Sequence, residues 1–354
     1  MKVVHMPYNI ASWAPINVQA LKAHGVDAKA VVFGGKGALH EHNYVEYIPQ
    51  NSFWEKLKSI WTFYKLVKWA DIIHWYYDDK ILPFNLALKI VRWSKKPAIV
   101  EWLGSDIRDP RIEFQNNPYY KEFFDNFGNS NPDLIGNNAF LLQKKFGDTG
   151  FASMVCPEMK EYLKEELYRN NYLLRQRIDL ESIQKIQSEE TEKDHFYICH
   201  APSQKDVKGT KYIIQAIDQL INQGYPIKFD LIENVPHSEA LKRIAKSDIF
   251  IDQLNLGAYG MAALEGLSLN KTVLCFIKKD NIPNYPEDCP ILNVNKDNIQ
   301  SCLKDLLNHP EKIYETGSKG RNYVDRYHST RALIPELIKI YQHEINLKGK
   351  SHLK

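Results

Sequence analysis

The sequence predicts an α/β protein made of two Rossmann-like, doubly wound domains. Short apolar runs alternate with segments of helical spacing in both halves of the chain, which is typical of parallel sheets covered by helices. The chain has 354 residues, more than one hydrophobic core usually serves. Its composition, 44% hydrophobic and 25% charged, is ordinary for globular proteins. We therefore expect two domains of similar size.

In the first half, the expected strands are residues 2–5, 28–33, 72–76 and 98–102, with Leu134 and Ile135 marking another. Ligands on such sheets gather outside the carboxyl ends of the strands. The loops that follow His5, His74 and Trp102 should therefore line a cleft.

In the second half, the expected strands are residues 196–199, 228–232, 249–251 and 273–277. Residues 158–194, between the halves, are charged and helix-prone, and their Glu- and Lys-rich end predicts an exposed linker. We place the domain boundary near Lys193, which gives an N-terminal domain of 1–193 and a C-terminal domain of 194–326.

Composition also argues against several classes of protein. A net charge of +3, without an aromatic RNA-binding signature, argues against a nucleic-acid-binding protein. The five cysteines are widely spaced and lack a CxxC pair, which argues against a disulfide framework and against a zinc site. No apolar run is long enough to cross a bilayer, and Met1 is followed directly by a strand-like run rather than a leader. We expect a cytoplasmic protein.

Residues 248–276 are the most informative stretch, because they are expected to form a strand, a glycine loop, a helix and a second strand. A helix that begins at Gly260 or Met261 would direct free backbone N–H groups and its positive dipole end at a ligand, and a diphosphate suits that place. Glu265, one turn later, would reach hydroxyls of a sugar attached to the phosphate. The alternative is an ordinary β–α turn with a solvated glutamate.

This stretch resembles the donor-binding signature of the family 4 glycosyltransferases (glycosyl transferases group 1), which have the GT-B fold of two Rossmann-like domains facing a central cleft. The matching residues are Tyr259, Gly260, Glu265, Gly266 and Lys271 to Val273. The resemblance implies that Glu265 holds the nucleotide ribose and that the loop of Gly257, Tyr259, Gly260 and Met261 binds the donor. The first glutamate of the family pattern falls on Gly257, so donor-sugar handling departs from the family.

The polar loop after residues 196–199 carries a second part of the resemblance. Lys208-Gly209 matches a Lys-Gly pair whose cation neutralises the donor pyrophosphate in the family. The arginine that accompanies it falls on Pro202, and we expect Lys205, from the same loop, to take its role. The alternative is that both lysines belong to a solvated loop.

Polar residues at strand ends of the first half are the candidates for catalysis. Asp106 and Arg108 follow the strand 98–102 and are expected to orient the acceptor hydroxyl, although Asp106 is equally suited to capping a turn. The histidine common in the family at this place falls on Leu103. His74 is a further rim candidate beside Asp78 and Asp79, with a structural histidine as its alternative.

The first loop supplies the expected acceptor contacts. Asn9 and Ser12 suit hydrogen bonds to acceptor hydroxyls, and Trp13 either stacks on a pyranose face or closes the core.

Residues 53–69 predict an amphipathic helix. The stripe expected to pack on the sheet is Phe53, Leu57, Ile60, Tyr64 and Val67. Trp54 and Trp61 stand beside Lys58 and Lys65, a mixture expected of a surface lying on anionic headgroups. The alternative is a core helix with solvated lysines.

Together with these patterns, the family resemblance implies a hexosyltransferase-like enzyme of surface polysaccharide or glycoconjugate synthesis. It would move a sugar from a nucleotide diphosphate donor to a glycan or lipid-linked acceptor, with no metal or other cofactor, and sit in the cytoplasm with a possible peripheral contact to the inner face of an anionic membrane. The resemblance implies retention at the anomeric carbon, and a C-terminal helix at about 327–347 that packs back on the first domain. Two alternatives remain open: a GT-B nucleotide-sugar epimerase, and a non-catalytic GT-B binding subunit.

Overall fold

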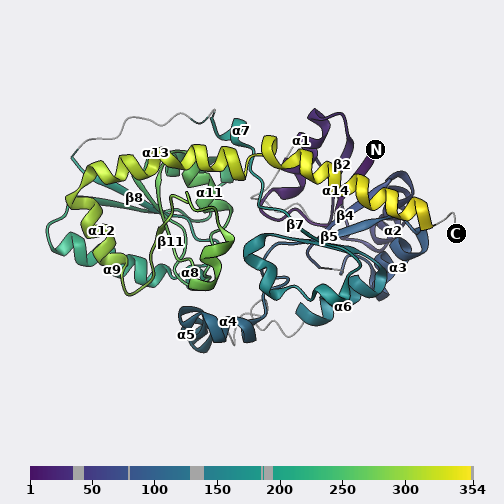
Figure 1. The fold of residues 1–354 in the computed structure, drawn as a ribbon, viewed down its shortest axis with the longest axis horizontal. Helices are drawn as coiled ribbons and strands as arrows, with labels where there is room; N and C mark the ends of the chain where they lie inside the picture. The colour runs from purple at the N-terminus through teal and green to yellow at the C-terminus, as the bar shows by residue number, and fades with distance from the viewer. Residues whose placement is uncertain (35–43, 79, 128–138, 185, 187–193, 352–354) are drawn as a thin grey trace. The chain divides into compact units, whose positions relative to one another are not determined.

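The computed structural model describes residues 1–34, 44–78, 80–127, 139–184, 186 and 194–351 (Figure 1). The chain forms two compact units. Unit 1 contains residues 1–109, 136–177 and 330–354, and unit 2 contains residues 110–135 and 178–329.

Unit 1 is built on a seven-stranded parallel sheet of order β3-β2-β1-β4-β5-β6-β7. The strands are β1 (Lys2–Met6), β2 (Asp27–Phe33), β3 (Val45–Ile48), β4 (Ile72–Tyr76), β5 (Ala98–Trp102), β6 (Ala152–Val155) and β7 (Asn171–Leu173). The central strands β4 and β5 are buried along their whole length, which explains why each contains a single polar residue, His74 or Glu101.

The helices of unit 1 include a long C-terminal one. They are α1 (Trp13–Ala23), α2 (Phe53–Trp69), α3 (Leu86–Ser94), α6 (Ala139–Thr149) and α14 (Thr330–Ser351), with single 3₁₀ turns η1 (Pro83–Asn85), η3 (Pro157–Tyr162) and η4 (Glu165–Leu167). Helix α14, yellow in Figure 1, lies beside α1 and contacts β4.

Unit 2 has a five-stranded parallel sheet of order β12-β11-β10-β8-β9. The strands are β8 (Phe196–His200), β9 (Ile227–Leu231), β10 (Ile249–Ile251), β11 (Thr272–Cys275) and β12 (Leu292–Asn293). Side chains alternate between its two faces: Ile198, Ile251 and Leu274 belong to one apolar cluster, and Cys199 and Phe250 to the other.

Helices cover both faces of this second sheet, as a doubly wound fold requires. The helices of unit 2 are α4 (Pro110–Asn116), α5 (Pro118–Phe127), α7 (Leu180–Gln184), α8 (Lys205–Lys208), α9 (Thr210–Asn222), α10 (His237–Lys246), α11 (Met261–Ser268), the 3₁₀ helix η5 (Lys279–Asn284), α12 (Ile299–Asn308) and α13 (Pro310–Tyr327).

The limits of the units differ from the expected domain limits. Lys193, like Leu134 and Ile135, lies outside the described residues. In this part of the chain, unit 1 ends at Arg177 and unit 2 begins at Ile178. Residues 110–135 belong to unit 2, because α4 and α5 place Phe114, Tyr120 and Phe123 against Val207 and Leu256 there. Part of the segment expected to be helix-prone, 158–194, forms a strand instead, since β7 pairs with β6 inside the unit 1 sheet. Most of the predicted exposed linker, from Glu181 onward, lies outside the described residues.

The predicted inward face of α2 is wrong in part. Val67 is buried as predicted, but Phe53 is 68% exposed and Leu57 is 44% exposed, and Phe63 and Leu66 are buried instead. Phe63 fixes this orientation, because its ring packs against Phe33 and Trp75 with centroid distances of 5.7 and 6.0 Å.

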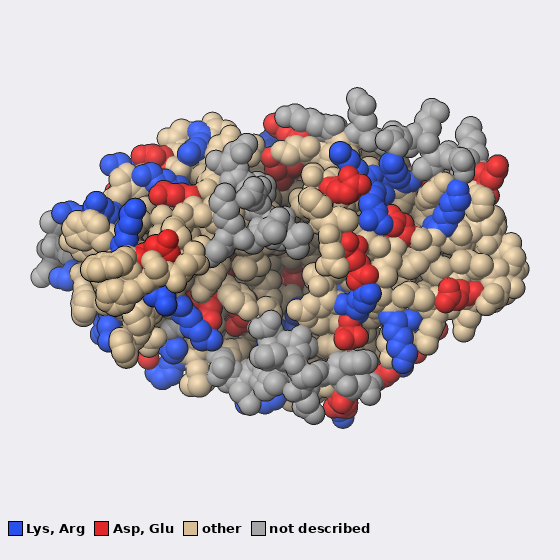
Figure 2. Space-filling view, turned by 180° about the vertical axis from the view of Figure 1, so that it is seen from behind, with Lys and Arg blue, Asp and Glu red and all other residues tan. Residues whose placement is uncertain are grey.

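Charged residues of both signs cover the described surface. On the face drawn in Figure 2, blue Lys and Arg are interspersed with red Asp and Glu. This mixture agrees with the small net charge of +3.

Candidate functional site

The sheet of unit 2 has a topological switch point between β8 and β10. The chain leaves β8 for β9 on one side and then returns to β10 on the other side of β8. Crevices open at the carboxyl ends of two such strands, because the connecting helices run to opposite faces. The loop and helix α8 that follow β8, and the loop that follows β10, meet at this point.

Lys208 and Asp252 form an ion pair at the switch point. Lys208 Nζ lies 2.7 Å from Asp252 Oδ1, and the side chains are 14% and 1% exposed. Asp252 Oδ2 also accepts the backbone N–H of Gly260 at 3.3 Å. One buried carboxylate therefore connects the lysine of α8 to the residue that precedes helix α11.

Helix α11 begins at Met261, with Gly260 as its N-cap in an extended conformation. The prediction that a helix begins at Gly260 or Met261 is confirmed. The N–H groups of its first turn have no partner within the helix and point out of its N-terminus, where the dipole is positive. Together with Lys208, this end of α11 provides the positive groups that a diphosphate needs.

Glu265 lies in the second turn of α11 and is hydrogen-bonded to a histidine. His237 Nε2 lies 2.7 Å from Glu265 Oε1, and the Glu265 side chain is 14% exposed. This hydrogen bond raises the pKa of His237, although burial opposes it. The carboxylate of Glu265 is thus held in position by the first residue of α10.

Two glycines shape the loops around these groups. Gly209 has φ +76° and would place a Cβ 3.1 Å from Leu254 Cβ, so a side chain is strained there in two ways. Gly257 has φ +70°, and a Cβ would lie 3.0 Å from the side chain of Lys278. That side chain is buried and forms an ion pair with Glu113 of α4. Lys278 therefore fills the space beside the position at which the family pattern has its first glutamate.

The other predicted donor residues lie in different surroundings. The Tyr259 ring is 1% exposed, stacks on Tyr285 at 4.4 Å, and its hydroxyl is hydrogen-bonded to His328. The side chain of Tyr259 therefore lies in the core, and donor binding by this residue stays a prediction. Lys205 is half exposed, and its Nζ lies 2.8 Å from Glu233. A surface pair of this kind is weak, so it leaves Lys205 able to exchange partners.

The prediction that His74 stands on a rim is wrong. Its side chain is fully buried, with Nδ1 2.6 Å from the Tyr341 hydroxyl and Nε2 2.9 Å from Glu101. Burial lowers the pKa of His74, and its hydrogen bond and attraction to Glu101 oppose this. The neutral ring then donates its Nε2 proton to Glu101 and accepts from Tyr341, a structural arrangement.

Glu101 also binds Arg177, whose Nη2 lies 2.6 Å from both carboxylate oxygens. Burial alone would raise the pKa of Glu101, but Arg177 and then His74 bring it below its ordinary value. The Arg177 guanidinium lies 5.0 Å over the ring of Trp13, which is 4% exposed. Trp13 is therefore a core residue of unit 1, and the pyranose-stacking alternative is wrong.

The remaining candidates of unit 1 lie in two loops. Asp106 accepts the backbone N–H groups of Leu103 and Gly104, at 3.0 and 2.8 Å, so it stabilises the turn after β5. Burial raises its pKa to about 6, although these bonds oppose the shift. Arg108 donates from Nη2 to Met159 Sδ at 3.9 Å.

In the first loop, Ser12 is only 5% exposed, which is too little for the predicted contact with an acceptor. Asn9 is half-buried. Asp78 is hydrogen-bonded to the backbone N–H of Lys80, and Asp79 lies outside the described residues.

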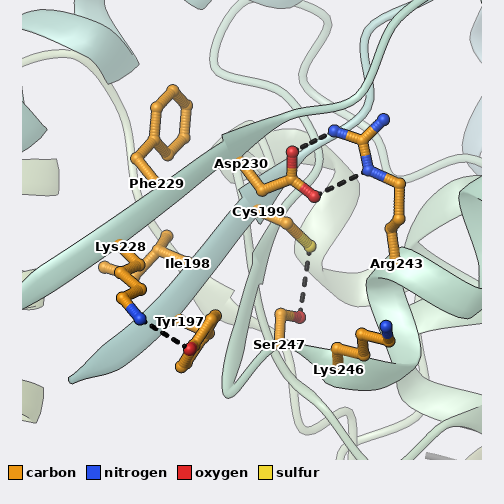
Figure 3. Close-up of a pocket in the computed structure, with 9 residues that line it drawn as sticks. All are labelled: Tyr197, Ile198, Cys199, Lys228, Phe229, Asp230, Arg243, Lys246 and Ser247. Carbon is orange, nitrogen blue, oxygen red and sulfur yellow. Dashed lines mark hydrogen bonds and ion pairs between the residues drawn. The ribbon is translucent and has the colours of Figure 1, made fainter. Parts of the chain in front are cut away.

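A separate cavity of about 290 Å³ lies in unit 2 between β8, β9 and α10 (Figure 3). Its polar groups contact one another. Arg243 Nε lies 2.8 Å from Asp230 Oδ2, and the Cys199 thiol donates a hydrogen bond to Ser247 Oγ at 3.1 Å. Burial raises the pKa of Cys199 to about 12, which leaves an unreactive thiol. None of the predicted donor residues lines this cavity.

The residues that the structure describes contain no group of three or more His, Cys, Asp or Glu side chains arranged to hold a metal ion. None of their helices has the length and apolar character needed to cross a bilayer.

Comparison with known proteins gives matches at the level of structure. No family model and no curated protein matches the sequence. Sucrose-phosphate synthase from Thermosynechococcus elongatus is similar in structure, with a TM-score of 0.64 at 11% identity over 97% of this chain and 98% of that one. HepE from Anabaena in complex with UDP has a TM-score of 0.61 at 12% identity, covering 97% and 100%. A putative UDP-N-acetylglucosamine 2-epimerase from Listeria monocytogenes gives 0.54 at 12% identity, covering 92% and 93%.

The chain has the GT-B fold. At identities this low, structural similarity establishes the fold alone, so the reaction has to be inferred from the site. Within this GT-B chain, Asp252 connects Lys208 and Gly260 at the switch point of unit 2, and Glu265 lies one turn further along α11.

Two residues of this site were missed from the sequence. Asp252 is the first polar residue after the buried strand β10, and this position at a strand end is its sequence signal for a role in the site. His237 has no local signal, because it meets Glu265 only after α10 and α11 are packed side by side.

Proposed function

We propose that this GT-B protein is a glycosyltransferase that moves a sugar from a nucleotide diphosphate sugar to a glycan or lipid-linked acceptor. The observation that carries the proposal is the arrangement in unit 2 of Lys208, the N-terminus of α11 and Glu265. The first two match the charge of a diphosphate, and the third matches the hydroxyls of a ribose. Several of the similar solved structures are complexes with UDP or UDP-glucose, which supports this class of donor.

The proposed chemistry uses the same groups. When the bond between the anomeric carbon and the phosphate oxygen breaks, negative charge develops on the leaving diphosphate. Lys208 and the first-turn N–H groups of α11 stabilise that charge, and Asp252 already holds Lys208 and the N-cap residue Gly260 in place. The released phosphate takes the acceptor proton in a retaining, metal-independent transfer, as the family 4 resemblance implies.

The proposed setting is the synthesis of surface polysaccharide or glycoconjugate, with the enzyme in the cytoplasm and in contact with the membrane that presents the acceptor. Asp106, Arg108 and Asn9 remain the proposed acceptor-side residues of unit 1. Asp106 acts there by fixing the turn after β5, on the evidence of its backbone hydrogen bonds.

A binding experiment tests the donor site. We would measure thermal stabilisation by UDP, GDP and their sugars for the native chain, Lys208→Ala and Glu265→Ala. Lys242→Ala is the matched control, since Lys242 is an exposed lysine of α10. We expect one nucleotide to stabilise the native chain and the control, and both site variants to lose most of that shift. A native chain that no nucleotide stabilises would contradict the proposal.

Turnover separates the remaining alternatives. Release of nucleoside diphosphate from a donor sugar is expected of a transferase. Conversion of UDP-N-acetylglucosamine to an isomer, without release, is the outcome for an epimerase, a class that the similarity to the Listeria protein keeps open. Nucleotide binding without either product would identify a non-catalytic subunit.

A further inference from the structure

The outward face of α2 carries large apolar side chains. Phe53, Trp54 and Trp61 are 68%, 76% and 56% exposed, and Leu57 and Tyr64 are 44% and 43% exposed. Positions 54, 57, 61 and 64 follow the spacing of one helix face, so these side chains form a continuous stripe. Contiguous exposed aromatic residues mark an interaction surface.

Helix α3 extends this surface. A groove of about 550 Å³ is lined by Leu57, Ile60, Trp61 and Tyr64 from α2 and by Leu86 and Ile90 from α3. Leu86, Ile90 and Trp93 are spaced by four and three residues, and Trp93 is 69% exposed. Phe84, just before α3, is 90% exposed. The aromatic face consists of Phe53, Trp54, Leu57, Trp61, Tyr64, Phe84 and Trp93.

Exposed cations accompany the aromatic face. They are Lys56, Lys58, Lys65, Lys68, Lys89, Arg92 and Lys95. Within the part of the chain that the structure describes, none of the seven forms an ion pair. The one acidic residue of α2, Glu55, accepts the backbone N–H groups of Asn51 and Ser52. Lys65 Nζ lies 5.1 Å from the centroid of the Trp61 ring, so charge and aromatic surface are adjacent.

We propose that the aromatic face docks unit 1 on a bilayer that contains anionic lipid. Tryptophan and tyrosine favour the level of the headgroups, where the ring is in an apolar layer and the N–H or O–H remains hydrated. Lysines at the border of the face extend their apolar stems along it and place their ammonium groups against lipid phosphates. The pattern is that of a helix lying in the plane of the interface.

A second copy of the chain is a poorer occupant of the aromatic face. In a two-fold dimer through this face, the seven cations of one chain would lie close to the same seven cations of the other chain. Like charges that approach across an interface oppose association. An anionic bilayer instead complements both the apolar and the cationic parts of the surface.

The docking proposal extends the proposed function to the membrane. The lipid-linked acceptor that it invokes is part of that proposed function and rests on it. Unit 1 is the proposed acceptor unit, and the aromatic face would hold it at the surface in which such an acceptor is embedded. The docking step itself involves neither nucleotide nor turnover, so it is tested independently.

The test is co-sedimentation with vesicles of phosphatidylcholine, with and without phosphatidylglycerol. We expect the native chain to bind the anionic vesicles and to lose binding as salt is raised. Trp54→Ala with Trp61→Ala should weaken binding at least tenfold, and Lys58→Glu with Lys65→Glu should abolish it. All four residues are exposed, so thermal stability and nucleotide binding should stay unchanged.

Matched controls come from unit 2. Tyr314→Ala with Ile282→Ala removes apolar side chains that are 71% and 52% exposed, and Lys242→Glu with Lys304→Glu reverses two exposed lysines. Both controls should bind vesicles like the native chain. Absence of binding to anionic vesicles, or equal losses in the variants and the controls, would overturn the proposal. So would a dimer in light scattering that Trp54→Ala with Trp61→Ala dissociates, since that outcome assigns the face to a second copy.

Discussion

Lys208 Nζ and Asp252 Oδ1 lie 2.7 Å apart at the carboxyl edge of the unit 2 sheet, and the same carboxylate accepts the Gly260 N–H. The ammonium group is therefore placed before any ligand arrives. Because Asp252 is almost completely buried, it holds Lys208 and the start of α11 in one fixed relation.

We predict that Lys208→Ala lowers affinity for a nucleoside diphosphate by about tenfold or more, the usual effect of losing a charge-assisted hydrogen bond. Calorimetric titration at fixed salt measures the change. Lys242→Ala should leave the affinity unchanged. Equal losses in the two variants would show that only the overall charge matters and that the switch point is not the site.

We predict that the pKa of His237 lies above the ordinary histidine value and falls in Glu265→Gln. The hydrogen bond that the imidazolium of His237 donates to Glu265 stabilises the charged ring, although burial opposes it. A raised folded-state pKa means that this stabilisation is present below the unfolded pKa and is lost as pH rises through the folded one. NMR titration of the imidazole in both proteins measures the difference. An unchanged pKa in Glu265→Gln would contradict the pairing.

We predict that Gly209→Ala destabilises the protein by more than Gly224→Ala does. Both positions have positive φ, +76° and +90°, so each alanine meets backbone strain on the order of 1–3 kcal/mol. Only the Cβ at 209 would also approach a neighbour, Leu254 Cβ at 3.1 Å. Urea unfolding of the two variants gives the comparison, and equal losses would exclude the contact.

We predict that Arg177→Met costs about 3–5 kcal/mol, because it leaves the Glu101 carboxylate charged and buried without its partner. The double variant Arg177→Met, Glu101→Gln should recover part of this loss, since the amide carries no charge. Arg92→Met, at an exposed arginine, is the control. The measurement is the free energy of unfolding in urea. A double variant less stable than Arg177→Met would contradict the explanation.

The sequence predicted best where local chemistry decides the structure. Strands β4, β5 and β10 match their predicted ranges, because each is a short apolar run bounded by polar turns. Gly260 and Met261 marked the start of α11 correctly, since a glycine before a helix-forming run is itself a signal.

Other features depend on packing between distant segments. Large apolar residues surround α2 on several sides, so helical spacing could not choose the buried face, and Phe63 decided it by meeting Phe33 and Trp75. The sequence placed His74 at an exposed strand end, but in the structure the hydroxyl of Tyr341, from a distant segment, bonds to its ring. No pattern within one segment reports such partners.

The bond between His74 and Tyr341 has a consequence for how the protein is made. Unit 1 is assembled from three stretches of chain, and α14 supplies Tyr341 only after every residue of unit 2 has been synthesised. The sheet that is synthesised first can therefore complete its packing only after unit 2 has been made, because His5 and His74 still lack their common partner until then. Unit 1 thus contains both the first strand and the last helix to be synthesised.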